Sequence, residues 1–331
     1  MANYRIFYAV QSVGVAKDGF QAFTAIRGLQ SIGVNTKFNL EQYFEEGQMA
    51  LYAHLEGVPD VEITMEKVLD GDPLIYHLAT QQGSAASLVG RSTAKCIVGL
   101  SLFPDTSLSA SGTAVAQCQM SGVYVSSLNY NVQVQGAVTE QVTLVGNSKV
   151  WNQSFTAPTF DNTDTPSASE GVERRQDILF GSAQSLLPTA IPGISASGTN
   201  DVGTQGYAAH LQSIKVSANL GREALYELGT KAVYCRYVNF PVEVRSDFEL
   251  IAITGDNVAA NPTATNLTAQ TIKLVFREGT TINLGANNKL TSVSHAGGNA
   301  SQGGGNVSHT FSFVTYNDLT VTATHDPSAL S

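Results

Sequence analysis

A block of the first half of this 331-residue sequence recurs in the second half. The motif Leu29-Gln30-Ser31-Ile32 reappears 182 residues later as Leu211-Gln212-Ser213-Ile214. Held without gaps over residues 29–59, this offset gives eleven identical positions, namely Leu29, Gln30, Ser31, Ile32, Val34, Glu41, Glu45, Gly47, Ala50, Tyr52 and Pro59. Ordinary residue usage would supply about two by chance. The repeat predicts two tandem copies of one domain.

The boundary between the copies is expected in a polar stretch. Residues 152–177 are rich in Asn, Thr, Ser, Pro and Asp, which is typical of a linker or an exposed excursion. We therefore expect a first domain over residues 1–151, a polar linker over 152–177 and a second domain over 178–331.

Alternation of apolar and polar residues predicts a mainly β fold. Residues 61–69 alternate almost strictly, which places one face of a strand on a core. A turn is expected at residues 70–73, with a returning strand at 74–78. Longer strands are expected at 123–134 and 139–146, and the second copy has its counterparts at 290–295 and 309–314.

One short α-helix is expected in each copy. In residues 39–47, Asn39 is a suitable N-cap, and Gly47 is placed to stop the helix. The matching residues 221–229 end at Gly229 in the same way.

The hairpin at 123–146 has one apolar face and one small-polar face. The polar face includes Gln133, Gln135, Gln141 and Thr143, which we predict to line a water-filled lumen. An ordinary solvated sheet has the same pattern, and alternation alone does not say which face points inward.

Charge is scarce and its balance is acidic. Charged residues make up 14% of the chain and the formal net charge is −9. Few charges suit a surface packed against copies of the same chain, or else a polar, uncharged all-β protein. The acidic balance argues against a protein that grips nucleic acid, but it permits DNA to slide past without sticking. The start of the sequence lacks a signal-peptide pattern, so we expect assembly in a cytoplasm.

Motifs for catalysis, cofactors or metals are missing from the sequence. The glycine-rich residues 297–306 are not followed by Lys-Ser/Thr, so they do not form a phosphate loop. The six histidines and three cysteines have no metal-ligand spacing. We expect no enzyme, no cofactor and no metal site. A sugar-binding or catalytic β-sandwich would require a convergent polar or aromatic pocket, and one Trp gives it little support.

The sequence pattern of both halves resembles that of the tail tube proteins of long-tailed bacteriophages. The resemblance rests on the order of elements and on stretches such as Asn39-Leu40-Glu41-Gln42, Val142-Thr143-Leu144-Val145-Gly146-Asn147, Gly221-Arg222-Glu223-Ala224-Leu225-Tyr226-Glu227-Leu228-Gly229 and Pro241-Val242-Glu243-Val244. It implies two β-sandwich or half-barrel domains, whose long strands join those of neighbours into an inner β-barrel. Stacked rings would form a conduit for DNA within the virion tail.

The same resemblance implies which partners the chain has. Its first partner is itself, through ring closure and ring stacking, and a tail sheath or other tail proteins are further partners. DNA would pass through without specific binding, and no membrane is involved. A duplicated chain favours a trimer with pseudo-sixfold symmetry over a hexamer, and both stay open. The alternative is another virion part, such as a baseplate hub, tail terminator or capsid decoration protein.

Overall fold

In a computed structural model, the chain is a mainly β protein built from antiparallel sheets. The structure describes residues 5–20, 22–81, 85–106, 108–169, 171–180, 184–194, 210–262, 267–298 and 305–323. Its only α-helix within these ranges is α1 (Ile75–Thr80), and short 3₁₀ turns occur at Tyr8–Val10 and Arg175–Asp177.

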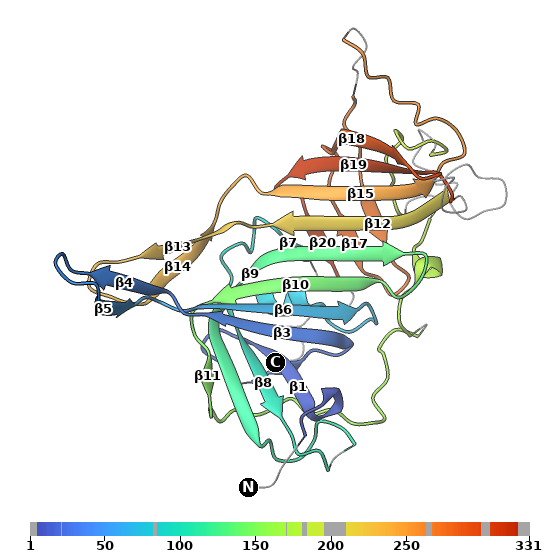
Figure 1. The fold of residues 1–331 in the computed structure, drawn as a ribbon. Coiled ribbons are helices and arrows are strands. Elements are labelled where there is room, and N and C mark those ends of the chain that lie inside the picture. Colours follow the sequence, from blue (N-terminus) through green and yellow to red (C-terminus); the bar gives the residue numbers. More distant parts are fainter. Residues whose placement is uncertain are drawn as a thin grey trace.

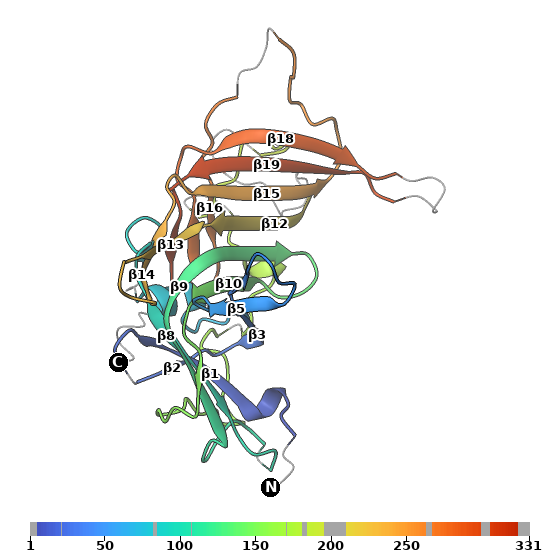
Figure 2. The same ribbon diagram turned by 60° about the vertical axis from the view of Figure 1, so that its left-hand side comes forward.

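Eight strands run side by side through the main sheet (Figure 1). Each pairs with its neighbours in antiparallel fashion. In spatial order they are β18 (Lys289–Ala296), β19 (Ser308–Tyr316), β15 (Glu243–Ile251), β12 (His210–Asn219), β9 (Ala116–Gln133), β10 (Thr139–Gly146), β6 (Asp60–Val68) and β3 (Leu29–Lys37). The four strands of the second half thus lie on one side of the four strands of the first half, as Figure 2 also shows.

A second layer covers one face of the main sheet. One part of it is a four-stranded sheet, in the order β16 (Lys273–Val275), β17 (Thr281–Asn283), β20 (Thr320–Thr322) and β7 (Ala85–Ser87), which lies behind the main sheet in Figure 1. The other part extends from the N-terminal portion of β9, and consists of β8 (Cys96–Leu102), β1 (Gln11–Lys17), β2 (Thr24–Ala25) and β11 (Val150–Trp151). Helix α1 contacts β1, β7 and β9.

The core lies between these layers because strand alternation sends apolar side chains to the covered face. In β6, Val61, Ile63 and Met65 are buried, and in β10 the same holds for Val142 and Leu144. The strands expected at 61–69, 123–134, 139–146, 290–295 and 309–314 are therefore confirmed.

The two predicted helices are wrong. Residues 39–47 contain β4 (Leu40–Phe44), which pairs with β5 (Leu51–Glu56), and residues 221–229 contain β13 (Arg222–Tyr226), which pairs with β14 (Val233–Val238). Gly47 and Gly229 do have positive φ angles, of 98° and 87°, but they lie in hairpin turns and stop no helix. The apolar residues of these segments face no core, and a helix this short has no stability without one.

The strand expected at 74–78 is also wrong, because α1 occupies these residues. A buried carboxylate on β10 accepts hydrogen bonds from the first N–H groups of this helix, and no local pattern announces such a partner.

Candidate functional site

The uncovered face of the main sheet is polar across all eight strands. Gln133 and Gln141 are exposed on it and Thr143 is half-buried, while Gln135 lies in the turn between β9 and β10. Gln141 lies opposite Asn129 of β9. Three of the four predicted lumen residues therefore share a face, and whether that face lines a lumen stays a prediction.

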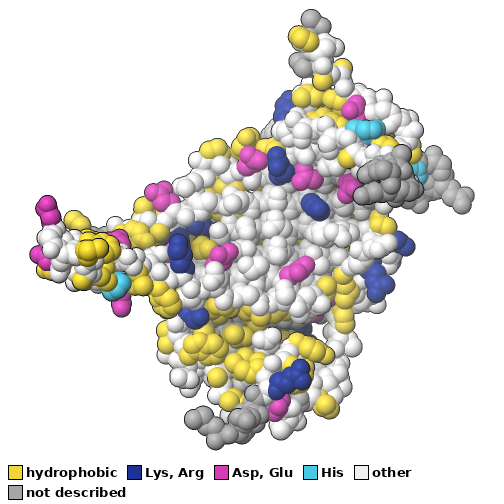
Figure 3. Space-filling view, in the orientation of Figure 1, with side chains coloured by type: hydrophobic (Ala, Val, Ile, Leu, Met, Phe, Trp, Pro, Cys, Tyr) yellow, Lys and Arg dark blue, Asp and Glu magenta, His cyan; other side chains and the backbone are white. Residues whose placement is uncertain are grey.

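The uncovered face is also polar on the strands of the second half of the sheet. Ser213 donates a hydrogen bond to Glu249 (3.1 Å), and Ser312 donates to Asp247. Lys215 and Arg245 are exposed among them. In Figure 3 the middle of this face is mainly uncharged and polar, with single charges of both signs scattered over it. Such a surface offers no apolar patch and no concentrated basic track for phosphate groups.

The main sheet ends in two free edges. β3 pairs with β6 on one side only, and β18 pairs with β19 on one side only. Unpaired backbone N–H and C=O groups on a regular edge are a template for another strand. No strand among the described residues pairs with the outer side of β3 or of β18, so each edge is available for pairing with another chain.

Two hairpins project from one end of the main sheet (Figure 1), and we call β4–β5 the first arm and β13–β14 the second arm. Every residue of β4 and β5 is exposed. Large apolar side chains are nevertheless frequent on both arms; the exposed ones are Leu40, Tyr43, Phe44, Met49, Leu51, Tyr52, Leu55, Leu225, Tyr226, Leu228, Tyr234 and Tyr237. A lone two-stranded hairpin is marginal in water, so these apolar arms need a surface to pack on.

An ion pair ties the bases of the two arms together. Arg236 of β14 contacts Asp60 of β6 (Nη2 to Oδ1, 2.7 Å) and donates to the side chain of Asn147 (3.2 Å). Asn39 donates to the other oxygen of Asp60 (2.9 Å). Burial acts to raise the pKa of Asp60, but the hydrogen bonds from Asn39 and Arg236 outweigh it and hold that pKa below its ordinary value.

Asp60→Asn is expected to lower the free energy of unfolding at neutral pH by about 1 kcal/mol or less, because Asp60 is half-exposed. A lowered folded-state pKa means that this stabilisation is present above the unfolded-state pKa, near 3.8, and is lost as the pH falls through the folded value. Urea melts from pH 7 to pH 3 should therefore show the two proteins converging in acid. A gap that stays constant with pH would contradict this origin.

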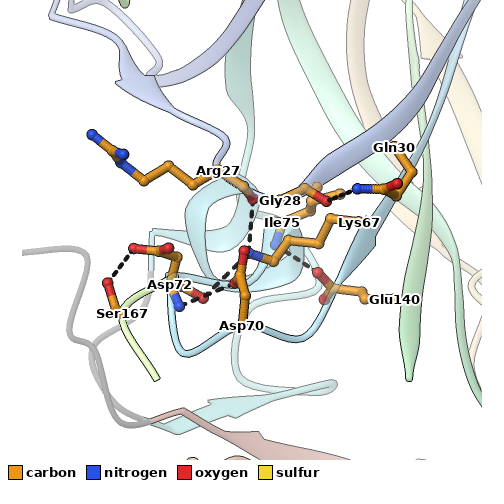
Figure 4. A network of polar contacts seen from close by, with 9 residues as sticks. All are labelled: Arg27, Gly28, Gln30, Lys67, Asp70, Asp72, Ile75, Glu140 and Ser167. Atoms are coloured by element: carbon orange, nitrogen blue, oxygen red, sulfur yellow. Dashed lines mark hydrogen bonds and ion pairs between the residues drawn. The ribbon is translucent and has the colours of Figure 1, made fainter. Parts of the chain in front are cut away.

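A buried charged network lies between β6, β10 and α1 (Figure 4). The Lys67 side chain is 0% exposed, and its Nζ contacts Asp70 Oδ1 (2.8 Å) and donates to the carbonyl of Arg27 (2.9 Å). Glu140 accepts from the N–H groups of Ile75 (2.7 Å) and Tyr76 (3.2 Å). Burial raises the pKa of Glu140 and of Asp70.

This network is enclosed, which indicates a structural role. Tyr130 of β9 adds a hydrogen bond from its hydroxyl to Glu140 (3.0 Å), and both side chains are buried. On β18 and β19, the ring nitrogens of His295 and His309 lie 2.8 Å apart. Sequence reasoning passed over Lys67 and Glu140, although alternation with Met65 and Val142 would have placed both on the inner face.

The part of the chain that the structure describes holds no group of three or more His, Cys, Asp or Glu side chains suited to a metal ion. Nor does any helix in the described ranges have the length and hydropathy that crossing a bilayer demands.

Comparison with known proteins does not assign the chain to a family. No protein-family model matches the sequence, and no curated protein matches it. Solved structures that overlap with it include the tube-terminating cap of the anti-feeding prophage, at a TM-score of 0.35 and 12% identity over 46% of this chain and 95% of that chain. The sixfold-symmetrised baseplate of the same particle overlaps at a TM-score of 0.32 and 12% identity, over 45% and 97%. TM-scores this low carry no functional argument.

Proposed function

We propose that this chain is a structural subunit of a phage tail tube, in which closed rings form a β-barrel that conducts DNA and no catalysis takes place. The observation that carries the proposal is the junction between β9 and β12. These strands join the two halves of the chain through seven antiparallel residue pairs, from Ser213–Gln133 to Asn219–Ser127. The N–H of Val134 donates to the carbonyl of Gln212 (3.0 Å) at one end of the junction.

The proposal treats the two halves as copies of one domain, with limits at 1–151 and 178–331 and the polar linker between. The strand order β3-β6-β10-β9 corresponds to β12-β15-β19-β18. A register shift follows Leu29 in the first half and Leu211 in the second, and it skips Gln30 and Gln212 respectively. A second pair of shifts skips Ser126 and Thr291. Matching irregularities at matching places support descent from one unit.

Under this correspondence, the two free edges, β3 and β18, match the two strands that pair at the β9–β12 junction. β3 corresponds to β12, and β18 corresponds to β9, so β18 of one chain can pair with β3 of the next as β9 pairs with β12. Transferring the observed register gives Val34 opposite His295, Asn35 opposite Ser294 and Lys37 opposite Ser292. Head-to-tail pairing of this kind closes into a ring and leaves no strand edge exposed.

Barrel width favours three chains over six. Three chains supply twenty-four strands of the main sheet, since each chain contributes eight. At ordinary strand spacing and tilt, such a barrel measures roughly 45–50 Å between opposite backbones, which admits a DNA duplex after side chains are added. Six chains would give about twice that width.

A cysteine pair tests the ring. We expect Asn35→Cys/Ser294→Cys to cross-link between chains under mild oxidation or with a short bismaleimide, because residues opposite each other on paired strands have Cβ atoms roughly 5 Å apart. Denaturing gels should show dimers and trimers, with a closed trimer as the largest product.

The matched control is Glu62→Cys/Ser294→Cys. Glu62 lies beside Asn35 on β6, one strand further from the edge, and should cross-link far less. Equal yields for both pairs, or no cross-linking of the first, would contradict ring closure through β3 and β18. Larger covalent rings would indicate six chains.

The alternative, a tail terminator, baseplate hub or other virion part, shares ring closure but requires no long stacks. Negative-stain electron microscopy of the purified chain separates the two: tubes support the tube subunit, and single rings at all concentrations support the alternative.

A further inference from the structure

The arms have counterparts at the opposite end of the main sheet, where two grooves lie. β3 and β12 each begin at a groove and lead toward an arm, and nine or ten extended residues cover roughly 30 Å. The first groove, of about 550 Å³, is lined by Leu211, Gln212, Ser213 and Ile214 together with the end of β9. The second groove, of about 500 Å³, is lined by Leu29, Gln30, Ser31 and Ile32. These are the residues of the repeated motif, so the two grooves correspond as the two arms do.

The first groove combines apolar lining with positive charge. Val132, Leu179 and Phe180 contribute to its walls, and Arg175 and Arg277 lie at its rim. An adjoining cavity is lined by Arg174 and Arg175. All three arginines are exposed. Arg175 donates to the carbonyl of Val134 (3.1 Å) and Arg277 contacts Asp177 (3.4 Å), which leaves several of the five N–H donors of each guanidinium available.

The first arm has the complementary character. Its turn carries the exposed carboxylates Glu45 and Glu46, and Phe44 and Met49 flank them with apolar surface, Met49 being 100% exposed. Figure 3 shows acidic and apolar side chains together on the arms, and Lys and Arg side chains at the opposite end of the sheet. An acidic apolar tip and a basic apolar groove at opposite ends of one molecule suit a contact between copies that follow one another in the same direction.

We propose that the first arm of one copy seats in the first groove of a copy in the next ring, with Glu45 and Glu46 facing Arg174 and Arg175. This rests on the ring of the proposed function. By the 182-residue correspondence, the second arm contacts the second groove of a copy in the next ring. In that groove, β18 of the neighbouring chain takes the place that β9 has in the first groove. Since arm and groove are different surfaces, the contact is heterologous and repeats without limit along one axis.

Charge reversal tests the contact on the full chain. Glu45→Arg/Glu46→Arg alters the arm, and Arg174→Glu/Arg175→Glu alters the groove while sparing Arg277, whose partner Asp177 is buried. We expect each double variant to form rings with at least a tenfold loss of stacked rings in electron micrographs and sedimentation profiles. The quadruple variant, which restores opposite charges, should stack again. The control Glu62→Arg/Glu243→Arg reverses two exposed acids outside the arms and should stack like the wild type.

The outcomes separate the two proposals. If rings of the arm variant stack as well as those of the wild type, this contact alone is overturned. The arms would then be expected to bind another tail protein. Failure of the quadruple variant to stack, with both double variants folded by circular dichroism, would also overturn it. A wild-type chain that forms no rings would overturn the ring and this contact together. Should the groove variant not fold, deletion of residues 41–55 with a Gly-Gly bridge applies the same criterion from the arm side.

Discussion

Lys67→Met is expected to lower the free energy of unfolding by about 3–5 kcal/mol, because it leaves the buried Asp70 carboxylate without its charged partner. The ammonium also holds the carbonyl of Arg27, which would lose a donor in a dry environment. Burial already raises the pKa of Asp70, and the Lys67 charge acts against that rise. The loss should therefore be smaller in acid, where protonation removes the isolated charge. Urea unfolding at several pH values measures both effects.

Two further variants make the interpretation specific. Lys67→Met/Asp70→Ala removes both charges and should recover part of the loss, since an apolar replacement of a whole buried pair costs much less than breaking it. Lys215→Met removes an exposed lysine from the polar face and should stay within about 0.5 kcal/mol of the wild type. A loss at Lys215 equal to that at Lys67 would show that burial is not the cause.

If the polar face lines the conduit, Gln133→Lys/Thr143→Lys is expected to slow DNA release from particles assembled with the variant by roughly tenfold or more. Three chains would place six added lysines in every ring, and each attracts passing phosphates. Counter-ion release makes such contacts strong, so DNA would adhere to the wall. Real-time release of DNA, or plaque counts, would measure the effect.

Thr106→Lys serves as the control because it adds charge on an exposed loop that follows β8, outside the eight strands that carry the polar face. It should leave release unchanged. Normal release from correctly assembled particles of the double variant would remove the lumen assignment and place the other face of the sheet, or another channel, around the DNA. Rings that fail to form at all would be visible in micrographs and would point to assembly instead.

The long strands were predictable because their side chains obey a local rule. β6 and β10 alternate between core and solvent residue by residue, and that pattern survives in any sheet with one covered face. The order of strands in space followed no such rule. Nothing local in Asn219 or Ser127 announces that β12 pairs with β9, because the two residues are far apart along the sequence.

The arms were mispredicted for a related reason. Leu40, Tyr43 and Phe44 fall on one face of a helix when counted along the sequence, and the exposed hairpin that they form instead buries none of them. A pattern of this kind assumes that apolar residues face the core of their own chain. In the arms they are exposed, and under the proposed contact their partner is the groove of another copy.

The hydrogen-bonded junction between β9 and β12 lies within one chain, which has a kinetic consequence for the proposed ring. Half of the inter-domain seams of a six-domain circle are made within a chain, where they form at an effective concentration set by the linker rather than by the amount of protein. Only three seams then depend on encounters between molecules. Closure should depend on a lower power of protein concentration than in a ring of six separate domains, so rings can nucleate earlier during synthesis and fewer incomplete arcs accumulate.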